Sequence, residues 1–131
     1  MKILLDTHIM VWLATDRLSQ KAPKSIGYIE DKSNLLLFSS AVIWEVAVKR
    51  SKGREDFIID PFILYNGLLN AGYEELPITG RHTLLISSLP PIHKDPFDRI
   101  MLAQAMSEGI VFLTADKLLT QYPGSVIYTG I

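Results

Sequence analysis

The sequence predicts an α/β fold of three layers, in which helices cover both faces of a mainly parallel central sheet of four to five strands. Short apolar runs recur along the chain, and each is followed by polar residues and then by a stretch with the features of a helix start. Strands that alternate with helices are typical of parallel sheets covered on both faces. The 131 residues fit one domain of ordinary size, and no linker or low-complexity segment divides them, so we expect a single domain over residues 1–131.

Five segments are predicted to be strands. Residues 3–5 form a short continuous apolar run, which is typical of a strand buried on both of its faces. Pro77 makes the third segment a weak strand that suits the edge of a sheet better than its centre. In chain order, we expect strands at residues 3–5, 35–38, 75–78, 110–113 and 125–128.

The predicted helices begin at residues that commonly cap a helix. Ser19 can cap a helix that runs to Glu30 and tolerates Pro23 in its first turn. Asp60 and Asp95 each precede a proline, which is favoured at the first helical position because it has no N–H group to satisfy there. We expect helices at residues 9–14, 19–30, 41–49, 61–70, 80–87 and 96–109, and a short helix around residues 118–119.

The composition excludes several classes of site. The chain has no cysteine, so it can form no disulfide, thiolate metal site or thiol nucleophile, and this fits a cytoplasmic protein. The apolar start is too short for a signal peptide, and no uncharged apolar run approaches the roughly 20 residues of a membrane span, so we expect no membrane contact. The net charge of −1 argues against a generally basic nucleic-acid surface and leaves only a local basic patch possible.

Hydroxyl and carboxylate side chains follow the ends of the predicted strands. In a parallel sheet the carboxyl ends of all strands lie at one edge, and ligands bind outside that edge. We therefore expect polar groups from distant segments to meet there, namely Asp6, Thr7, Ser39, Ser40, Thr79, Thr114 and Asp116.

Glu45 is the only polar residue within residues 41–48 of a predicted helix. A helix that is apolar almost all round is buried, and an unpaired buried carboxylate is costly. One interpretation is an ion pair with Lys49, four residues later on the same helix. The other is that Glu45, just over one turn from the helix start, faces a pocket that contains Asp6.

Residues 93–99 hold two carboxylates, an arginine and a histidine at the start of an apolar helix. Asp95 can be the N-cap of this helix, and Asp98 can lie in its first turn beside the positive end of the helix dipole. Capping explains both aspartates without any further function. The other acidic residues favour a site instead.

Four acids are predicted to surround one small volume, with Asp95 nearby. Carboxylates packed together raise one another's pKa values, and a divalent cation relieves the repulsion. Oxygen ligands without cysteine favour Mg²⁺ or Mn²⁺ over Zn²⁺, and such a site can activate water and stabilise the leaving oxygen of a phosphodiester. The four predicted metal ligands and catalytic residues are Asp6, Glu45, Asp98 and Asp116. For Asp116, capping of the short helix at Leu118 is an equally good explanation.

Other polar residues are assigned supporting roles around these acids. Thr7, Ser40 and Thr114 can orient the carboxylates, although helix capping explains Ser40 equally well. His8 and His93 do not form a histidine-rich metal set, so we assign both to structural or supporting roles. A basic cluster follows the helix of Glu45 and can hold a polyanionic backbone near the metal, or can simply be a solvated helix end; its members are Lys49, Arg50, Lys52 and Arg54.

Four segments of the chain resemble the motifs of the PIN-domain ribonucleases, specifically those of the VapC toxins of bacterial type II toxin–antitoxin modules. These segments are residues 4–8, 39–49, 93–105 and 114–116, and they have the order and spacing of the family. Each motif alone is weak, but the four together span nearly the whole chain and are specific. The charged residues 52–56 depart from the more apolar segment that is usual in relatives, which bears on substrate and antitoxin contacts.

The resemblance implies a PIN-like domain that cleaves RNA endonucleolytically with Mg²⁺ or Mn²⁺. It also implies two protein partners, a small VapB-like antitoxin and a second copy of the toxin. Arg99 would have a conformational or substrate-contacting role, and Thr114 would support the site. By the resemblance, the metal-binding acids would be Asp6, Glu45, Asp98 and Asp116, with Asp95 a further candidate.

Two other functions are considered. A catalytically silent PIN-like module could use the same fold to bind RNA or protein, but the retention of all four acids counts against it. A phosphatase could use Asp6 as a covalent nucleophile. The chain has no second carboxylate two residues after Asp6, where the common aspartyl phosphatases place their acid/base.

Overall fold

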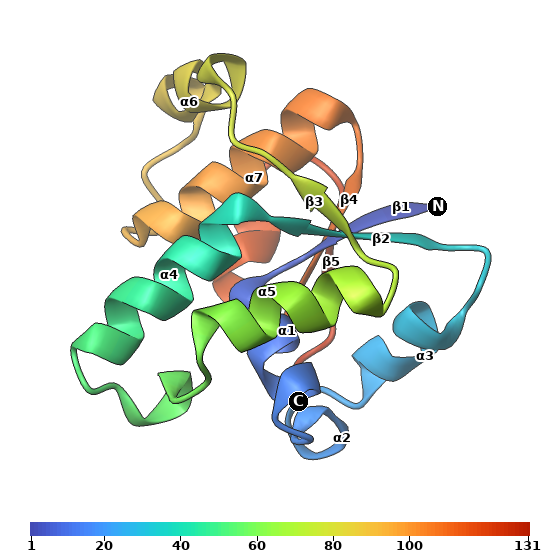
Figure 1. Cartoon of the computed structure of the whole chain (residues 1–131). Coiled ribbons are helices and arrows are strands. Elements are labelled where there is room, and N and C mark those ends of the chain that lie inside the picture. The colour runs from blue at the N-terminus through green and yellow to red at the C-terminus, as the bar shows by residue number, and fades with distance from the viewer.

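The computed structural model describes residues 1–131 and contains one sheet of five strands (Figure 1). The strands are β1 (Lys2–Leu5), β2 (Leu35–Ser39), β3 (Glu74–Leu76), β4 (Val111–Thr114) and β5 (Val126–Tyr128). Their order is β3-β2-β1-β4-β5, so β1 lies at the centre, and every neighbouring pair is parallel. The predicted α/β fold with a mainly parallel sheet of four to five strands is therefore confirmed.

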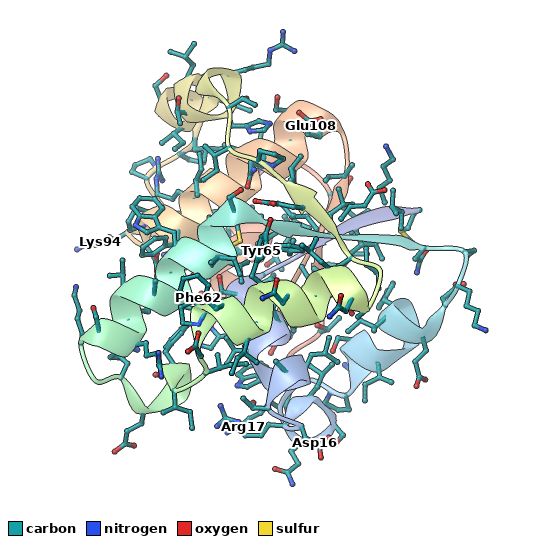
Figure 2. All side chains as sticks on the ribbon, viewed as in Figure 1. Asp16, Arg17, Phe62, Tyr65, Lys94 and Glu108 are labelled. Carbon is teal, nitrogen blue, oxygen red and sulfur yellow. The ribbon has the colours of Figure 1, made fainter.

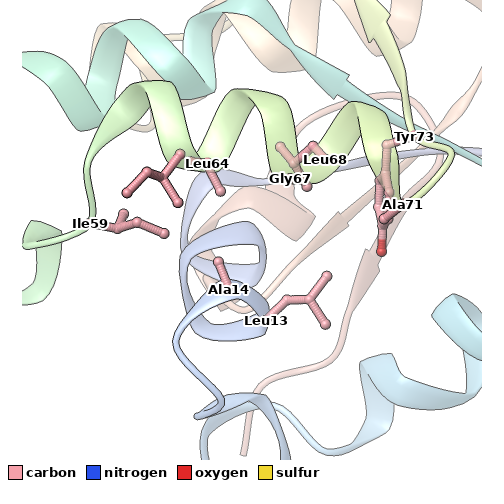
Figure 3. Close-up of a pocket in the computed structure, with 9 residues that line it drawn as sticks. Leu13, Ala14, Ile59, Leu64, Gly67, Leu68, Ala71 and Tyr73 are labelled. Atoms are coloured by element: carbon pink, nitrogen blue, oxygen red, sulfur yellow. The ribbon is translucent and has the colours of Figure 1, made fainter.

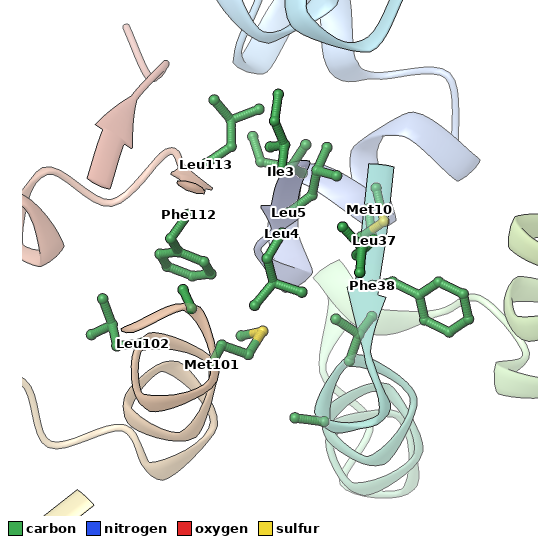
Figure 4. Close-up of a cluster of buried hydrophobic side chains, with 14 of the residues drawn as sticks. Ile3, Leu4, Leu5, Met10, Leu37, Phe38, Met101, Leu102, Phe112 and Leu113 are labelled. Carbon is green, nitrogen blue, oxygen red and sulfur yellow. The ribbon is translucent and has the colours of Figure 1, made fainter. Parts of the chain in front are cut away.

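Helices connect the strands and cover both faces of the sheet. They are α1 (Thr7–Ala14), α2 (Leu18–Lys21), α3 (Lys24–Glu30), α4 (Ser40–Ser51), α5 (Pro61–Asn70), α6 (Gly80–Leu85) and α7 (Pro96–Glu108), with short 3₁₀-helices η1 (Glu55–Phe57), η2 (Ile86–Ser88) and η3 (Lys117–Gln121). The helix α1 lies on one face of the sheet, and α4 and α7 lie on the other (Figure 4). The helix α5 packs against α1, α4 and β3. No helix is both long enough and apolar enough to cross a membrane.

The core consists of side chains that leave the central strands in alternate directions. Ile3 and Leu5 point to the face that α1 covers, together with Leu113 (Figure 4). Leu4 and Phe112 point to the opposite face, towards α7. Because both faces of these strands are buried, their central positions are apolar, and this explains why the sequence shows continuous apolar runs rather than alternation.

Prolines account for two of the differences from the predicted elements. The single helix predicted over residues 19–30 is wrong, because the chain forms α2 and α3 with a break at Ala22 and Pro23. Pro23 lacks an N–H group and disfavours helical backbone at the preceding residue, and Ala22 accordingly has φ −150° and ψ 65°. The third strand ends at Leu76, before Pro77, and lies at the sheet edge as predicted.

The register brings the carboxyl ends of β1 and β4 together. Leu5 pairs with Leu113, and the Asp6 N–H donates to the Leu113 carbonyl at 3.0 Å. Thr114, the last residue of β4, is therefore beside Asp6 although 108 positions separate them in the chain. This contact forms the floor of the site described next.

Candidate metal centre

A polar cleft of about 470 Å³ lies at the carboxyl ends of β1 and β4. Four aspartates from three separate regions of the chain line it, and basic and aromatic side chains complete its wall. The lining residues are Asp6, His8, Trp12, Lys49, Arg54, His93, Asp95, Asp98, Ala115, Asp116 and Lys117. The structure thus brings three of the four predicted metal ligands, and Asp95, around one volume.

Asp6 links β1 to α1 and is almost completely buried, with 3% of its surface exposed. One carboxylate oxygen caps α1 by accepting from the Ile9 N–H at 3.2 Å, and the other accepts from the Thr114 hydroxyl. Burial raises the pKa of Asp6, and the hydrogen bond from Thr114 partly offsets this rise. Thr114 thus contacts one of the four carboxylates around which a supporting role is predicted for it.

Asp95 and Asp116 also cap helices with one oxygen and contact cleft residues with the other. Oδ1 of Asp95 accepts from the Phe97 N–H at 2.8 Å, and Oδ1 of Asp116 accepts from the Leu118 N–H at 3.0 Å. Oδ2 of Asp95 lies 3.4 Å from the Lys49 ammonium, and Oδ2 of Asp116 lies 3.0 Å from Nε2 of His93. Capping and a role in the cleft are therefore compatible for both residues.

His93 lies between two of the acids, closer to them than the sequence indicated. Its Nδ1 accepts from the Asp95 N–H at 2.9 Å, so in the neutral ring the proton is on Nε2. Nε2 lies 3.0 Å from Asp116 and 3.4 Å from Asp98, and the ligand atoms of these three residues all fall within 4.8 Å of one another. Sequence patterns could not reveal this arrangement, because it depends on the conformation of the loop before α7.

Asp98, in the first turn of α7, has the most strongly perturbed carboxyl group of the cleft. Burial raises its pKa to about 8, together with the negative charges of four neighbouring acids, Asp6, Asp95, Glu45 and Asp116. All five predicted acids are therefore close enough to interact. Asp98 therefore lies in a strongly negative electrostatic potential, and a bound cation would reduce that potential.

Glu45 lies behind the cleft wall and is 2% exposed. It accepts hydrogen bonds from the Thr7 hydroxyl with one oxygen and from the Lys49 ammonium with the other. Both interpretations of the sequence therefore hold in part, since Glu45 pairs with Lys49 and also approaches the Asp6 segment. Desolvation lowers the pKa of Lys49, but the contacts with Glu45 and Asp95 outweigh it and the net shift is upward.

The residues of the cleft fit a divalent cation bound mainly by oxygen. The close carboxylates of Asp98 and Asp116, the adjacent Asp6 and the raised pKa of Asp98 all indicate uncompensated negative charge. No cysteine is present to favour a softer metal. Direct ligation by Glu45 stays a prediction, since both of its oxygens already have partners.

The predicted basic cluster divides into residues inside and outside the cleft. Lys49 and Arg54 line the cleft, whereas Arg50 is exposed and lies 3.8 Å from Asp60 at the start of α5. Lys52 is exposed and does not line it. Lys117 lines the cleft too, which the sequence analysis missed because this lysine is far from the cluster in the chain.

Two predicted supporting residues, Ser40 and Arg99, contact groups other than the predicted metal-binding acids. The hydroxyl of Ser40 donates to Glu75 at 2.9 Å, and Ser39 rather than Ser40 caps α4. Arg99 donates to the Pro90 carbonyl at 3.0 Å and to the Tyr122 hydroxyl at 3.1 Å. Arg99 therefore fixes the loop that carries His93, which is the conformational role considered for it.

Comparisons with known proteins agree with this geometry. Residues 3–124 match the family model of the PIN domain, whereas a search of curated proteins finds no similar sequence. Similar solved structures are VapBC2 from Rickettsia felis bound to a promoter DNA fragment, DNA-bound VapBC from Salmonella typhimurium, and VapBC-1 from nontypeable Haemophilus influenzae. The TM-scores are 0.73, 0.67 and 0.62, each with 17% identity and 98% of both chains covered.

At this level of identity, the likeness to solved structures demonstrates a shared fold. The family model carries more weight, because it matches nearly the whole sequence and includes the segments that supply Asp6, Glu45, Asp98 and Asp116. The resemblance expected from the four sequence motifs is thus confirmed at the level of the family: the chain belongs to the PIN-domain family.

Proposed function

We propose that this chain is a Mg²⁺- or Mn²⁺-dependent endoribonuclease and the toxin of a toxin–antitoxin module. The observation that carries the proposal is the gathering of carboxylates from distant segments around one polar cleft, where burial and four neighbouring acids raise the pKa of Asp98 to about 8. A divalent cation at such a position can activate water for attack on a phosphodiester and stabilise the leaving oxygen. Membership of the PIN-domain family supports the same reaction class.

In this proposal Asp6, Asp98 and Asp116 hold the metal ion. Glu45 and Asp95 complete the acidic surroundings, Glu45 either as a further ligand or through its contacts with Thr7 and Lys49. When bound there, such an ion would supply charge neutralisation for a phosphodiester and the activation of water.

The other residues of the cleft orient the acids or offer surface for the substrate. Thr114 fixes the second oxygen of Asp6, and the Nε2–H of His93 fixes that of Asp116. Arg54 and Lys117 stand at the cleft wall, where cationic side chains can hold the phosphates that flank the cleaved bond. His8 and Trp12 pack together with ring centroids 5.4 Å apart and offer an aromatic surface next to the acids.

The nuclease proposal is tested by Asp6→Asn and Asp98→Asn with total RNA, with Mg²⁺ and with EDTA. Each substitution keeps the size of the side chain and removes a metal-binding charge, so we expect the loss of at least about 99% of cleavage, equivalent to roughly 3 kcal/mol in transition-state stabilisation. Cleavage is measured on denaturing gels, and folding by circular dichroism.

The matched control is Asp16→Asn, an exposed aspartate with φ 58°, where asparagine is readily accommodated. This variant should cleave as the unchanged chain does. Undiminished Mg²⁺-dependent cleavage in both cleft variants would contradict the assignment. A chain that binds RNA without cutting it would favour the silent binding module.

We further propose a small antitoxin and a second copy of the chain as partners. The helix α5 exposes Phe62 and Ile63, of which Phe62 is 79% exposed (Figure 2). An apolar pocket of about 260 Å³ is lined by residues of α5 and α1 (Figure 3), and another of about 330 Å³ is lined by residues of α5 and α4. Contiguous apolar surface of this kind commonly marks a protein interface. The Salmonella, Haemophilus and Rickettsia structures contain VapBC complexes, which supports an antitoxin partner here.

A further inference from the structure

The ammonium group of Lys49 is held inside the acidic region rather than in solvent. Lys49 lies near the end of α4, yet only 15% of its side chain is exposed. Its Nζ contacts Glu45 on its own helix and lies 3.4 Å from Oδ2 of Asp95, across the cleft wall on the segment before α7. This single cation therefore joins two of the five acids.

Aromatic rings enclose the same ammonium group. Nζ lies 4.9 Å from the centre of the Phe57 ring and 5.8 Å from that of Phe97. A cation over aromatic faces is attracted to them, and the attraction is stronger where water is excluded. Together with the two carboxylates, the rings replace the hydration shell of the ammonium and fix its position.

Ion pairs between a lysine and the predicted acids therefore occur on one side of the cleft only, although Arg54 and Lys117 also line its wall. Lys49 neutralises the side formed by Glu45 and Asp95, whereas Asp98 and Asp116 contact the imidazole of His93 and no lysine or arginine. A divalent ion beside Glu45 and Asp95 would have to displace the ammonium or lie next to it. Two cations in such close contact repel strongly where water is scarce.

We propose that the Lys49 ammonium occupies the place of a second divalent cation, so that the cleft binds one metal ion, on the side of Asp98 and Asp116. The inference rests on the proposed function, since it assumes that the cleft binds metal. It deepens that function by naming the residue that sets the number of ions. Lys49 is thereby a positioning residue and not a ligand of the metal.

The test counts bound Mn²⁺ by titration calorimetry and by electron paramagnetic resonance, without RNA. We expect one ion per chain in the unchanged protein and in Lys49→Arg, which keeps the positive charge. Lys49→Met and Lys49→Gln should bind two ions, and the resonance spectrum should show the magnetic coupling of a neighbouring Mn²⁺ pair. Lys21→Met, which removes an exposed positive charge at the end of α2, should still bind one.

Several outcomes would overturn the inference. Two ions in the unchanged protein, or one ion with unaltered affinity in folded Lys49→Met and Lys49→Gln, would overturn it while leaving the nuclease proposal intact. No bound ion in any form would overturn both it and the proposed metal site. If neither neutral variant folds, as judged by circular dichroism, the count in the unchanged protein decides, since one ion supports the inference and two refute it.

Discussion

Among the acids of the cleft, Asp98 has the carboxyl group whose negative charge is least balanced by nearby groups. Its contact with Nε2 of His93 is 3.4 Å long, and burial and four acidic neighbours raise its pKa from 3.8 to about 8. Between these two values the folded chain holds a proton on Asp98 that the unfolded chain has released. The free energy of unfolding therefore falls as the pH rises through this window, because the folded state binds more protons there.

We accordingly predict that Asp98→Asn makes the metal-free protein less sensitive to pH. Between about pH 5 and 8 the unchanged chain should lose up to about 1.4 kcal/mol of unfolding free energy per pH unit through this group, and the variant should not. Urea unfolding in EDTA at several pH values measures the difference. An identical slope in both proteins would show that Asp98 is already ionised at neutral pH. Asp16→Asn should keep the slope of the unchanged chain.

At the scale of single residues, the sequence predicts roughly where the acidic side chains lie in the fold, but not which groups they contact. Asp6 and Asp116 directly follow strand ends, so the parallel sheet places them at one edge. Glu45 could be interpreted in two ways because its position on α4 fits both Lys49 and the Asp6 segment, and in the structure it contacts Lys49 and Thr7 without lining the cleft. The place of His93 could not be predicted, because a loop and not a regular element sets it.

Hydrogen bonds of the Arg99 side chain connect that loop to α7 and to Tyr122. The guanidinium of Arg99 donates to carbonyls of the segment between α6 and α7, those of Ile86, Pro90 and His93, at 3.0–3.4 Å. Tyr122 follows η3 in the chain. Its hydroxyl accepts hydrogen bonds from the Arg99 guanidinium and, at 2.6 Å, from the His93 N–H. One side chain of α7 therefore fixes the loop that precedes its own helix.

We predict that Arg99→Lys does not replace Arg99. A lysine has one ammonium, which cannot reach the separate carbonyls that the planar guanidinium contacts, so we expect a loss of roughly 1.5–3 kcal/mol in unfolding free energy. Hydrogen exchange should accelerate at His93, whose N–H points to Tyr122. Arg50→Lys, which changes an exposed arginine on α4, is the control. Unaltered stability together with unaltered hydrogen exchange in Arg99→Lys would show that the loop keeps its conformation without the contacts of Arg99.

Elements were predicted well where the determining signals are local. Asp60, Thr79 and Asp95 all cap the helices that they were expected to cap, because capping depends on a few neighbouring residues. The division of residues 18–30 into α2 and α3 was missed, although Pro23 marks it. Proline at that position was assigned to a first helical turn, but α3 begins only after it.

At the scale of the whole molecule, the exposed apolar surface of α5 calls for a partner. We predict that the purified chain has about twice its own mass of 14.7 kDa, and that the double variant Phe62→Ser and Ile63→Ser is monomeric. The serines remove apolar contact area that only an interface would bury. Light scattering during gel filtration measures both masses, with Leu84→Ser on α6 as an exposed control.

A mass of one chain for the unchanged protein would contradict the predicted homodimer. Dimers that persist in the double variant would place the contact away from α5. The fold class, in contrast, could be predicted from the sequence, because apolar runs alternate with capped helices along the whole chain and this alternation is typical of a parallel sheet.

The central position of β1 has a consequence for the synthesis of this protein. Asp6 is made 108 positions before its partner Thr114, and the acid Asp116 follows two positions after Thr114. A nascent chain on the ribosome therefore carries half of the acidic cleft long before the other half exists. The cleft can form only after Leu113, Thr114 and Asp116 have been made, so the proposed nuclease acquires its complete set of acids only at that point of translation.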